Sequence, residues 1–554
     1  MGALPVALMI AAAGCGNNAP TSADDSTDEP GLDNGASGQA GATGAAGATM
    51  DADGAAGGDA ASGVGRYTVF EVTLPYSQTG IANVWEDVTV SAVFTSPSGN
   101  AINVRGFYYS ADTWKVRFAP WELGSYRYHV TISTASAKQE SDGAFECVAS
   151  SEKGFVRSSQ ANALRLVFED GSLYNALGVG SCVQDPATPN WGLDGGDRSA
   201  GEAPATVDID TYLKAMAGDA KLNIYRWSVN NCAFEMWSKI AASGNQYLMR
   251  EGQWGDSLVT TMRKYGVRVY MDFFGWKPML ATNWQDKPSM DAVKRYVDYV
   301  VARYGAYVDF WEVCNESSPP PQWISLVADY VKSIDPYQHV VSSSWERPDL
   351  TAISLASPHW YEKEAELASD TRTVEKIEPL RRWGKPIVFG EQGNSVQNWD
   401  PLSSLRARIR SWTAFFDEAH LIFWESNFAK DYKAGAANLY IGPDLRKYFN
   451  VLQTFTGAVP ADVTRLTIVA APSGAARAYG LQSSQGIFAY VRDAQSYTAT
   501  KSGVTLAINP AKTGTARFYD TKTGAIVQET AVAAGAITLA VPPFVADIAL
   551  AIRY

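Results

Sequence analysis

Eight short apolar segments recur between residues 160 and 458, and this rhythm constrains the fold more than any other feature of the sequence. Most are rich in β-branched and aromatic residues and apolar on both faces, which is typical of parallel strands covered on both sides. The segments are YNALGVG (174–180), LNIYRWSV (222–229), VRVYMDFF (267–274), VDFWEVCN (308–315), HVVSSSW (339–345), AISLASPHWY (352–361), PIVFGEQG (386–393) and HLIFWESN (420–427). Helical patterns fill several of the intervals, so residues 160–458 are predicted to form a (β/α)8 TIM barrel.

The interval 288–305 has a clear helical pattern. Its apolar residues recur every three or four positions, and Gly305 follows where a helix is expected to end. These apolar residues are Val293, Tyr296, Val297, Val300, Val301 and Tyr304.

On either side of the predicted barrel, the sequence changes to short strands. Residues 66–150 and 460–554 contain alternating apolar and polar runs separated by turn-forming residues, which predicts an all-β sandwich in each. The chain is therefore predicted to be multidomain, with a central α/β barrel between two β-sandwiches.

The first 65 residues contain no lysine or arginine. Residues 1–15 resemble a bacterial lipoprotein signal that ends at Cys15, the residue that would carry the lipid, although the usual opening positive charge is missing. The alternative is an apolar, poorly ordered N-terminus. Residues 16–65 are rich in Gly, Ala and Asp and are predicted to be a disordered linker, because they offer too little apolar surface to offset chain entropy. We therefore expect an extracytoplasmic protein that is either anchored to the cell envelope at Cys15 or secreted.

Charge and residue counts disfavour several classes of function. The net charge is −12 and no long basic run is present, so nucleic acid is not an expected partner. The sequence has no glycine-rich phosphate loop, no His-Glu-x-x-His motif and no Gly-x-Ser-x-Gly motif. With only four histidines, a multi-histidine metal site is not expected. The prediction is catalysis without a cofactor or a metal.

Two glutamates lie where predicted strands end. Glu316 follows the fourth segment, and Glu391 lies near the end of the seventh. The active site of a (β/α)8 barrel lies at the carboxyl ends of its strands, and the curvature brings these two ends to opposite sides of one pocket. Cleavage of a glycosidic bond with retention needs two carboxyl groups about 5 to 5.5 Å apart, which makes this pair a candidate for such chemistry.

These motifs resemble those of clan A glycoside hydrolases, the group that includes the family 5 cellulases and mannanases. The resemblance rests on the Asn-Glu pair after the fourth strand, the glutamate of the seventh, HWY in the sixth and FWESN in the eighth. It implies that Glu316 is the general acid and base, that Glu391 is the nucleophile, and that Asn315 binds the 2-hydroxyl of the sugar. It also implies supporting roles at the same site for Arg226, His359, Tyr361 and Trp424.

The two carboxyl groups are expected to differ in protonation. The cation of Arg226 and the hydroxyl of Tyr361 are expected to keep Glu391 ionised. Apolar neighbours and the second negative charge are expected to raise the pKa of Glu316, as suits an acid catalyst.

Aromatic and acidic residues near the strand ends are further candidates. Six tryptophans fall in or beside predicted loops, where an indole either stacks on a sugar ring or packs within the loop: Trp191, Trp276, Trp284, Trp323, Trp345 and Trp360. Of these, Trp345 and Trp360 are the predicted sugar contacts. Glu312 is expected to pair inside the barrel. Asp272 either contacts substrate or makes a structural hydrogen bond, which we favour.

Three features keep two interpretations each. Residues 106–130 resemble a β-sandwich domain of unknown function that precedes the barrel in many bacterial glycanases, and they form either a spacer, which we favour, or a sugar-binding module. Cys182 and Cys232 either form a disulfide or remain buried thiols. Residues 184–203 form either a lid or a connection.

Taken together, the sequence predicts a retaining β-glycoside hydrolase that acts on an extracellular polysaccharide or oligosaccharide. Membrane contact is expected only through the lipid. The alternative is a surface carbohydrate-binding or adhesion protein on a hydrolase-like barrel.

Overall fold

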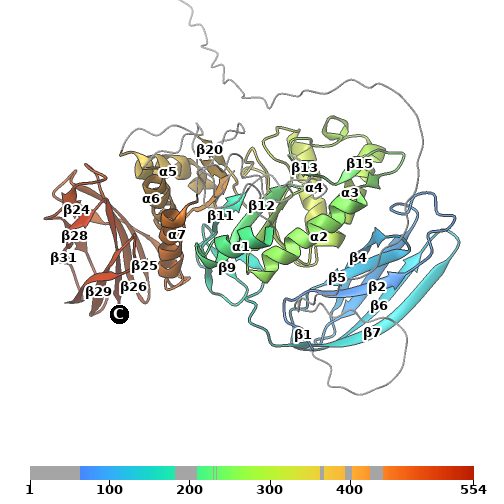
Figure 1. The fold of residues 1–554 in the computed structure, drawn as a ribbon, viewed down its shortest axis with the longest axis horizontal. Helices are drawn as coiled ribbons and strands as arrows, with labels where there is room; N and C mark the ends of the chain where they lie inside the picture. Colours follow the sequence, from blue (N-terminus) through green and yellow to red (C-terminus); the bar gives the residue numbers. More distant parts are fainter. Residues whose placement is uncertain are drawn as a thin grey trace, which may run out of the picture.

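The computed structural model describes residues 63–180, 209–228, 230–231, 234–361, 367–393, 402–424 and 441–554. Three units follow one another in it, an N-terminal β-unit, a central unit of strands and helices, and a C-terminal β-unit (Figure 1). Several predicted features lie outside the described residues: Cys15 and most of the linker, Cys182 and Cys232, Trp191, and the segment 184–203.

The central unit is built on one parallel sheet of eight strands. Along the sheet the order is β19-β18-β17-β12-β11-β22-β21-β20, so the first strand of the unit pairs with the last. The strands are β11 (Leu177–Gly180), β12 (Ile224–Ser228), β17 (Arg268–Asp272), β18 (Val308–Glu312), β19 (Val340–Ser342), β20 (His359–Tyr361), β21 (Val388–Gly393) and β22 (His420–Trp424). Each of the eight apolar segments thus contributes one strand, in the predicted chain order.

The sheet curls around an apolar interior. Ile224, Tyr270, Phe310, Val340 and Ile422 come from five different strands and are buried in one cluster. Side chains from β8 (Val156–Ser158), β9 (Leu166–Phe168) and β10 (Leu173–Tyr174) join the same cluster. Residues from so many strands meet only if the sheet bends back on itself.

A polar layer follows this apolar layer toward the carboxyl ends of the strands. Side chains on a strand alternate between faces, so the next inward-facing residue lies two positions further along. Those positions hold Arg226, Asp272, Glu312, Ser342 and Trp424, and all five are buried. Polar groups buried in a sheet interior need partners, so this layer is where a functional site is expected.

Helices cover the outer face of the sheet (Figure 1). In α3, the side chain of Asp286 accepts a hydrogen bond from the backbone of Ser289 (2.9 Å) at the start, and Gly305 follows at the end, close to the predicted limits. The helices are α1 (Ile209–Gly218), α2 (Met249–Lys264), α3 (Lys287–Tyr304), α4 (Pro321–Ile334), α5 (Ser369–Ile377), α6 (Ser403–Phe416) and α7 (Pro443–Thr456). Among the described helices, none has both the length and the apolarity needed to cross a bilayer.

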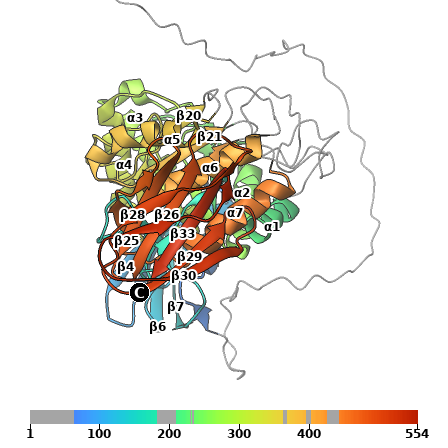
Figure 2. The same ribbon diagram turned by 90° about the vertical axis from the view of Figure 1, so that its left-hand side faces the viewer.

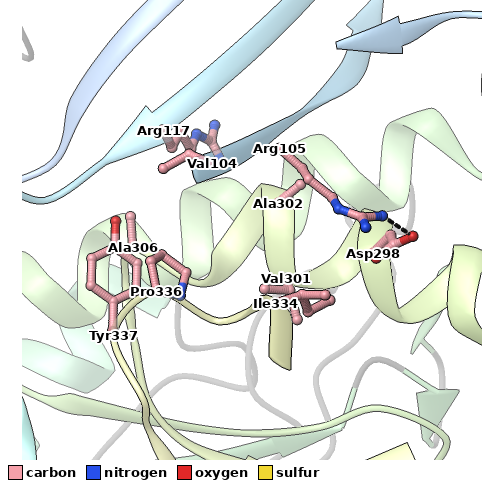
Figure 3. A pocket seen from close by; sticks show the side chains of 10 residues that line it. All are labelled: Val104, Arg105, Arg117, Asp298, Val301, Ala302, Ala306, Ile334, Pro336 and Tyr337. Carbon is pink, nitrogen blue, oxygen red and sulfur yellow. Dashed lines mark ion pairs between the residues drawn. The ribbon is translucent and has the colours of Figure 1, made fainter. Parts of the chain in front are cut away.

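The N-terminal β-unit is a seven-stranded sheet in the order β1-β7-β6-β3-β4-β5-β2 with its own apolar core. Its strands are β1 (Val64–Gly65), β2 (Phe70–Pro75), β3 (Thr89–Thr95), β4 (Ala101–Ser110), β5 (Thr113–Phe118), β6 (Gly124–Ser133) and β7 (Lys138–Val148). Strands β4 and β5 face α2 and α3, and Figure 3 shows side chains of both units meeting there. Arg117 of β5 donates to Asp256 of α2 (2.8 Å), which also accepts from Arg303 of α3 (2.8 Å).

The C-terminal β-unit packs against α5 and α6. Its largest sheet has the order β23-β25-β26-β33-β29-β30, and Figure 2 shows these strands from the side of this unit. Arg408 of α6 donates to Asp547 (2.8 Å), and Arg477 donates to Asp370 of α5 (2.8 Å). The strands are β23 (Thr464–Leu466), β24 (Val469–Ala471), β25 (Ala476–Ser483), β26 (Gly486–Asp493), β27 (Thr500–Lys501), β28 (Thr505–Ile508), β29 (Gly514–Asp520), β30 (Ile526–Val532), β31 (Ile537–Ala540), β32 (Phe544–Val545) and β33 (Asp547–Arg553).

The carboxylate of Asp256 is predicted to hold the N-terminal and central units together. Replacing Asp256 by alanine leaves Arg117 and Arg303 buried without their shared anion, which costs about 3–5 kcal/mol. We expect the midpoint of urea unfolding of Asp256→Ala to fall accordingly. Glu529→Ala, which removes an exposed partner of Arg517, serves as the control and should leave the midpoint unchanged. Equal midpoints for the two variants would contradict the role of Asp256.

Candidate active site

Two glutamates and a histidine converge at the carboxyl end of the curled sheet. An oxygen of Glu316, an oxygen of Glu391 and a ring nitrogen of His359 lie within 4.8 Å of one another. No other three His, Cys, Asp or Glu side chains among the described residues bring potential metal-ligating atoms so close together. The side chain of Glu316 is 29% exposed and that of Glu391 only 6%, so Glu316 is the more accessible of the two acids.

The guanidinium of Arg226 forms the floor of this site. Its Nε and Nη2 atoms bind one oxygen of Glu312 at 2.8 and 2.6 Å. Nη1 donates to Glu391 (2.8 Å), and Nη2 also donates to Oδ1 of Asn315 (2.8 Å). Burial lowers the pKa of Arg226, but the charges of Glu312 and Glu391 outweigh burial and raise it above its usual value. The cation is therefore permanent, and Glu312 pairs inside the sheet as the sequence predicts.

The second oxygen of Glu391 has its own donor. Tyr361 donates to it at 2.6 Å, the contact that the sequence predicts. Burial and the charge of Glu391 raise the pKa of Tyr361 well above its ordinary value, so its hydroxyl keeps its proton. With Arg226 on one oxygen and Tyr361 on the other, Glu391 is held as an oriented carboxylate.

Glu316 differs from the prediction in its pKa. Burial raises this pKa, but His359, whose Nδ1 lies 2.9 Å from the carboxyl group, and the more distant Arg226 outweigh burial and lower it below its usual value. The expectation of a raised pKa is therefore wrong, because it omitted the neighbouring histidine. The backbone of Glu316 has a φ of 41°, in the left-handed region, and such strain in a non-glycine residue is characteristic of functional sites.

The second ring nitrogen of His359 contacts a serine that the sequence did not predict as a site residue. Ser344 Oγ donates to Glu312 (2.6 Å) and lies 3.0 Å from Nε2 of His359. A hydroxyl has one hydrogen, and the short contact to a carboxylate takes it, so Nε2 carries a hydrogen that points at Ser344. Nδ1 then faces Glu316 at 2.9 Å and Glu391 at 3.4 Å. A hydrogen bond across the 2.9 Å contact places its hydrogen on Nδ1 or on the carboxyl group of Glu316.

Aromatic residues complete the walls of the site. The Arg226 guanidinium lies 5.7 Å from the ring of Trp424, and Gly180 leaves room for this indole, since a Cβ there would approach it to 2.7 Å. Trp345 is 46% exposed, and its ring lies edge-on to His359 at 5.8 Å. Asn315 is fully buried, and its Nδ2 has no acceptor among the described residues.

The remaining candidates lie away from the site or serve the fold. Trp360 is 3% exposed and packs against Phe389, because it alternates with the inward-facing His359 and Tyr361. The prediction that Trp360 contacts sugar is therefore wrong. Asp272 is fully buried and accepts a hydrogen bond from the backbone of Phe274 (3.0 Å), and burial together with Glu312 raises its pKa to about 7. The other tryptophans divide by exposure: Trp323 is buried, Trp284 is partly buried and Trp276 is 50% exposed.

Comparison with known proteins supports the same fold. The family described as "Domain of unknown function (DUF5060)" matches residues 63–133. A Bacteroides vulgatus structure described as a "putative glycoside hydrolase" has a TM-score of 0.61 at 15% identity and covers 89% of this chain and 99% of its own. A family 5 glycoside hydrolase from the same organism has a TM-score of 0.50 at 12% identity, covering 72% and 94%. No curated protein matches the chain. The chain therefore has a glycoside hydrolase-like fold.

The space at Gly180 is predicted to fix the position of Trp424. In Gly180→Ala the added methyl group meets the indole at 2.7 Å, and overpacking of this kind costs about 1–3 kcal/mol. We expect a lower unfolding midpoint and a changed tryptophan emission spectrum. Gly218→Ala is the matched control, because nothing lies within 4 Å of a Cβ at the end of α1, and it should be neutral or slightly stabilising. If Gly180→Ala is as stable as Gly218→Ala, the Trp424 indole moves aside without cost and its position is not fixed by Gly180.

Proposed function

We propose that this protein is a glycoside hydrolase that cleaves β-glycosidic bonds of a polysaccharide or oligosaccharide with retention of anomeric configuration. One observation carries the proposal: the carboxyl oxygens of Glu316 and Glu391 approach within 4.8 Å, with one acid fixed by a cation and the other open to solvent. Retaining enzymes place their two carboxyl groups about 5–5.5 Å apart, whereas inverting enzymes need about 6.5–9.5 Å to admit a water molecule.

The environments of the two acids support a division of roles. Glu391 is nearly buried and oriented by Arg226 and Tyr361, so it is suited to attack the anomeric carbon as the glycosidic bond to the leaving oxygen breaks. Glu316 is more accessible and gives its proton to that oxygen. In the second step Glu316 takes a proton from water, whose oxygen attacks the same carbon and releases Glu391.

His359 is proposed to supply the acid form of Glu316. Its Nδ1 lies 2.9 Å from the carboxyl group, close enough to pass a proton to it even though the pKa of Glu316 is lowered. Closure of the site around a sugar removes water and strengthens the effect of burial, which favours the neutral carboxyl group.

The finer assignment to clan A is part of the same proposal. We infer a complete (β/α)8 barrel flanked by two β-sandwiches, with Asn315, Trp345 and Trp424 contacting sugar. The free Nδ2 of Asn315 and the exposed ring of Trp345 support these roles. Anchoring to the cell envelope through Cys15 is also proposed, on the basis of the lipoprotein-like N-terminal sequence.

Separate replacement of the two acids tests the proposal. Glu316→Ala and Glu391→Ala should each slow hydrolysis of aryl β-glycosides with a poor leaving group by about 10³-fold or more. A dinitrophenyl leaving group needs no protonation, so it should restore the first step in Glu316→Ala and not in Glu391→Ala. Product configuration, followed by NMR in the wild-type protein, should match that of the substrate.

An exposed acid provides the control for these variants. Glu375→Ala, on the surface of α5, should hydrolyse the same substrates at the wild-type rate. Wild-type turnover in both Glu316→Ala and Glu391→Ala would rule out the assignment. Binding to β-glycans without release of reducing sugar would point instead to a binding protein.

The pH profile reports on His359. Burial raises the pKa of Glu316 while His359 lowers it, so His359→Gln leaves burial opposed only by the more distant Arg226, and the pKa of Glu316 rises. Glu316 then stays protonated to higher pH. We therefore expect the alkaline limb of kcat/KM to move to higher pH, together with a lower maximum. His129→Gln, at an exposed histidine of the N-terminal unit, should leave the profile unchanged; a shift to lower pH in His359→Gln would contradict the proposed coupling.

A further inference from the structure

A second cleft lies between the N-terminal β-unit and the central unit. It has a volume of about 440 Å³, within the range of pockets that hold small molecules. One wall is formed by residues 84–91 and by parts of β4 and β5, and the other by Arg295, Asp298 and Tyr299 of α3. None of these residues belongs to the candidate active site.

The lining combines aromatic rings with charges that neutralise each other. Trp85 lies edge-on to Tyr108 at 5.6 Å, and Tyr108 to Trp114 at 5.0 Å. Glu86 pairs with Arg295 at 2.6 Å. Arg105 pairs with Asp298, a contact marked in Figure 3. The four charged side chains of the lining therefore sum to zero, which gives no preference for an ionic ligand and leaves donors and acceptors for hydroxyl groups.

Two hydrogen-bond donors in this lining have no protein partner. The indole nitrogens of Trp85 and Trp114 are buried and find no acceptor, and Trp114 as a whole is only 1% exposed. Both nitrogens lie below the surface, so a ligand in the cleft does not reach them. The partly buried ring of Trp85 offers apolar surface to the C–H faces of a ligand, and the paired charges offer donors and acceptors to its oxygen atoms.

Hydrogen bonds join the rim of the cleft to the connection between β12 and α2. Asn83 donates to the backbone oxygen of Asn245 (2.9 Å), and the backbone N–H of Asn245 donates to Glu86 (2.7 Å). Trp85 also meets Tyr247 edge-on at 6.0 Å. Asn245 and Tyr247 belong to the connection that follows β12, the strand that carries Arg226. Connections of this kind lie on the catalytic face of a parallel barrel.

We propose that this cleft is a second binding site for a neutral oligosaccharide, which makes the N-terminal β-unit a sugar-binding module and not only a spacer. The inference rests on the proposed function for the choice of a glycan as ligand. Trp85 supplies the apolar ring surface, and Arg105 and Glu86 meet hydroxyl groups. A chain held here lies beside the connection that follows β12.

Hydrogen exchange of the full chain tests this proposal. The Glu391→Ala protein prevents turnover, and cellohexaose, mannohexaose and xylohexaose are added separately. At least one of them should protect peptides that cover residues 84–91 and 105–114. When Arg105→Ala or Trp85→Ala is introduced into this protein as well, the hexaose concentration needed for half-protection should rise about tenfold.

The control is Arg517→Ala, an exposed arginine of the C-terminal β-unit, which should leave the protection unchanged. Arg105 is half-exposed, so its replacement tests the cleft even if Trp85→Ala disturbs the fold. The absence of protection with all three hexaoses, or equal half-protection in Arg105→Ala, overturns the proposal. Hydrolysis by the wild-type protein is measured separately: turnover without protection removes only the second site, whereas protection without turnover removes only the hydrolase assignment.

Discussion

The buried guanidinium of Arg226 is the interaction on which the site depends. It joins the ends of three strands, because it lies in β12 and binds Glu312 at the end of β18, Asn315 just beyond β18, and Glu391 in β21. Burying charge is costly unless every charge is paired and hydrogen-bonded, and here one cation serves two carboxylates and an amide. The same contacts that make this burial tolerable also orient Glu391. Stability and positioning are therefore properties of one network, and neither can be altered without the other.

The layers beneath this network explain where the site lies. The apolar layer through Phe310 and Ile422 fills the interior of the sheet, and the polar layer sits directly on it. Water is excluded from below, so the electrostatic interactions of Arg226 act in a medium of low dielectric constant. Above this layer, the strained backbone of Glu316 turns its carboxyl group toward the shared imidazole of His359.

Much of this arrangement follows from sequence periodicity. The eight apolar segments predict the strands in order, and glutamates at strand ends predict the meeting of Glu316 and Glu391, because strand ends converge whatever the loops do. Properties that depend on neighbours distant in the chain could not be predicted from the sequence. The pKa of Glu316 is lowered by His359, which lies on another strand. Ser344 acts only indirectly, because it accepts the hydrogen on Nε2 of that histidine. The burial of Trp360 could have been predicted, since strict alternation along HWY turns its side chain away from those of His359 and Tyr361.

The amide of Asn315 determines which hydrogen-bonding role the oxygen of a bound sugar can take. Arg226 occupies its oxygen, so the group cannot rotate by half a turn, and it offers the cavity N–H and never a lone pair. A sugar oxygen placed there must act as an acceptor and direct its own hydrogen elsewhere. Under the proposed function this oxygen is that of the sugar 2-hydroxyl, and hydrogen bonds to this group strengthen in the transition state of glycoside cleavage. The polarity of that recognition is set from below, by the buried guanidinium of Arg226.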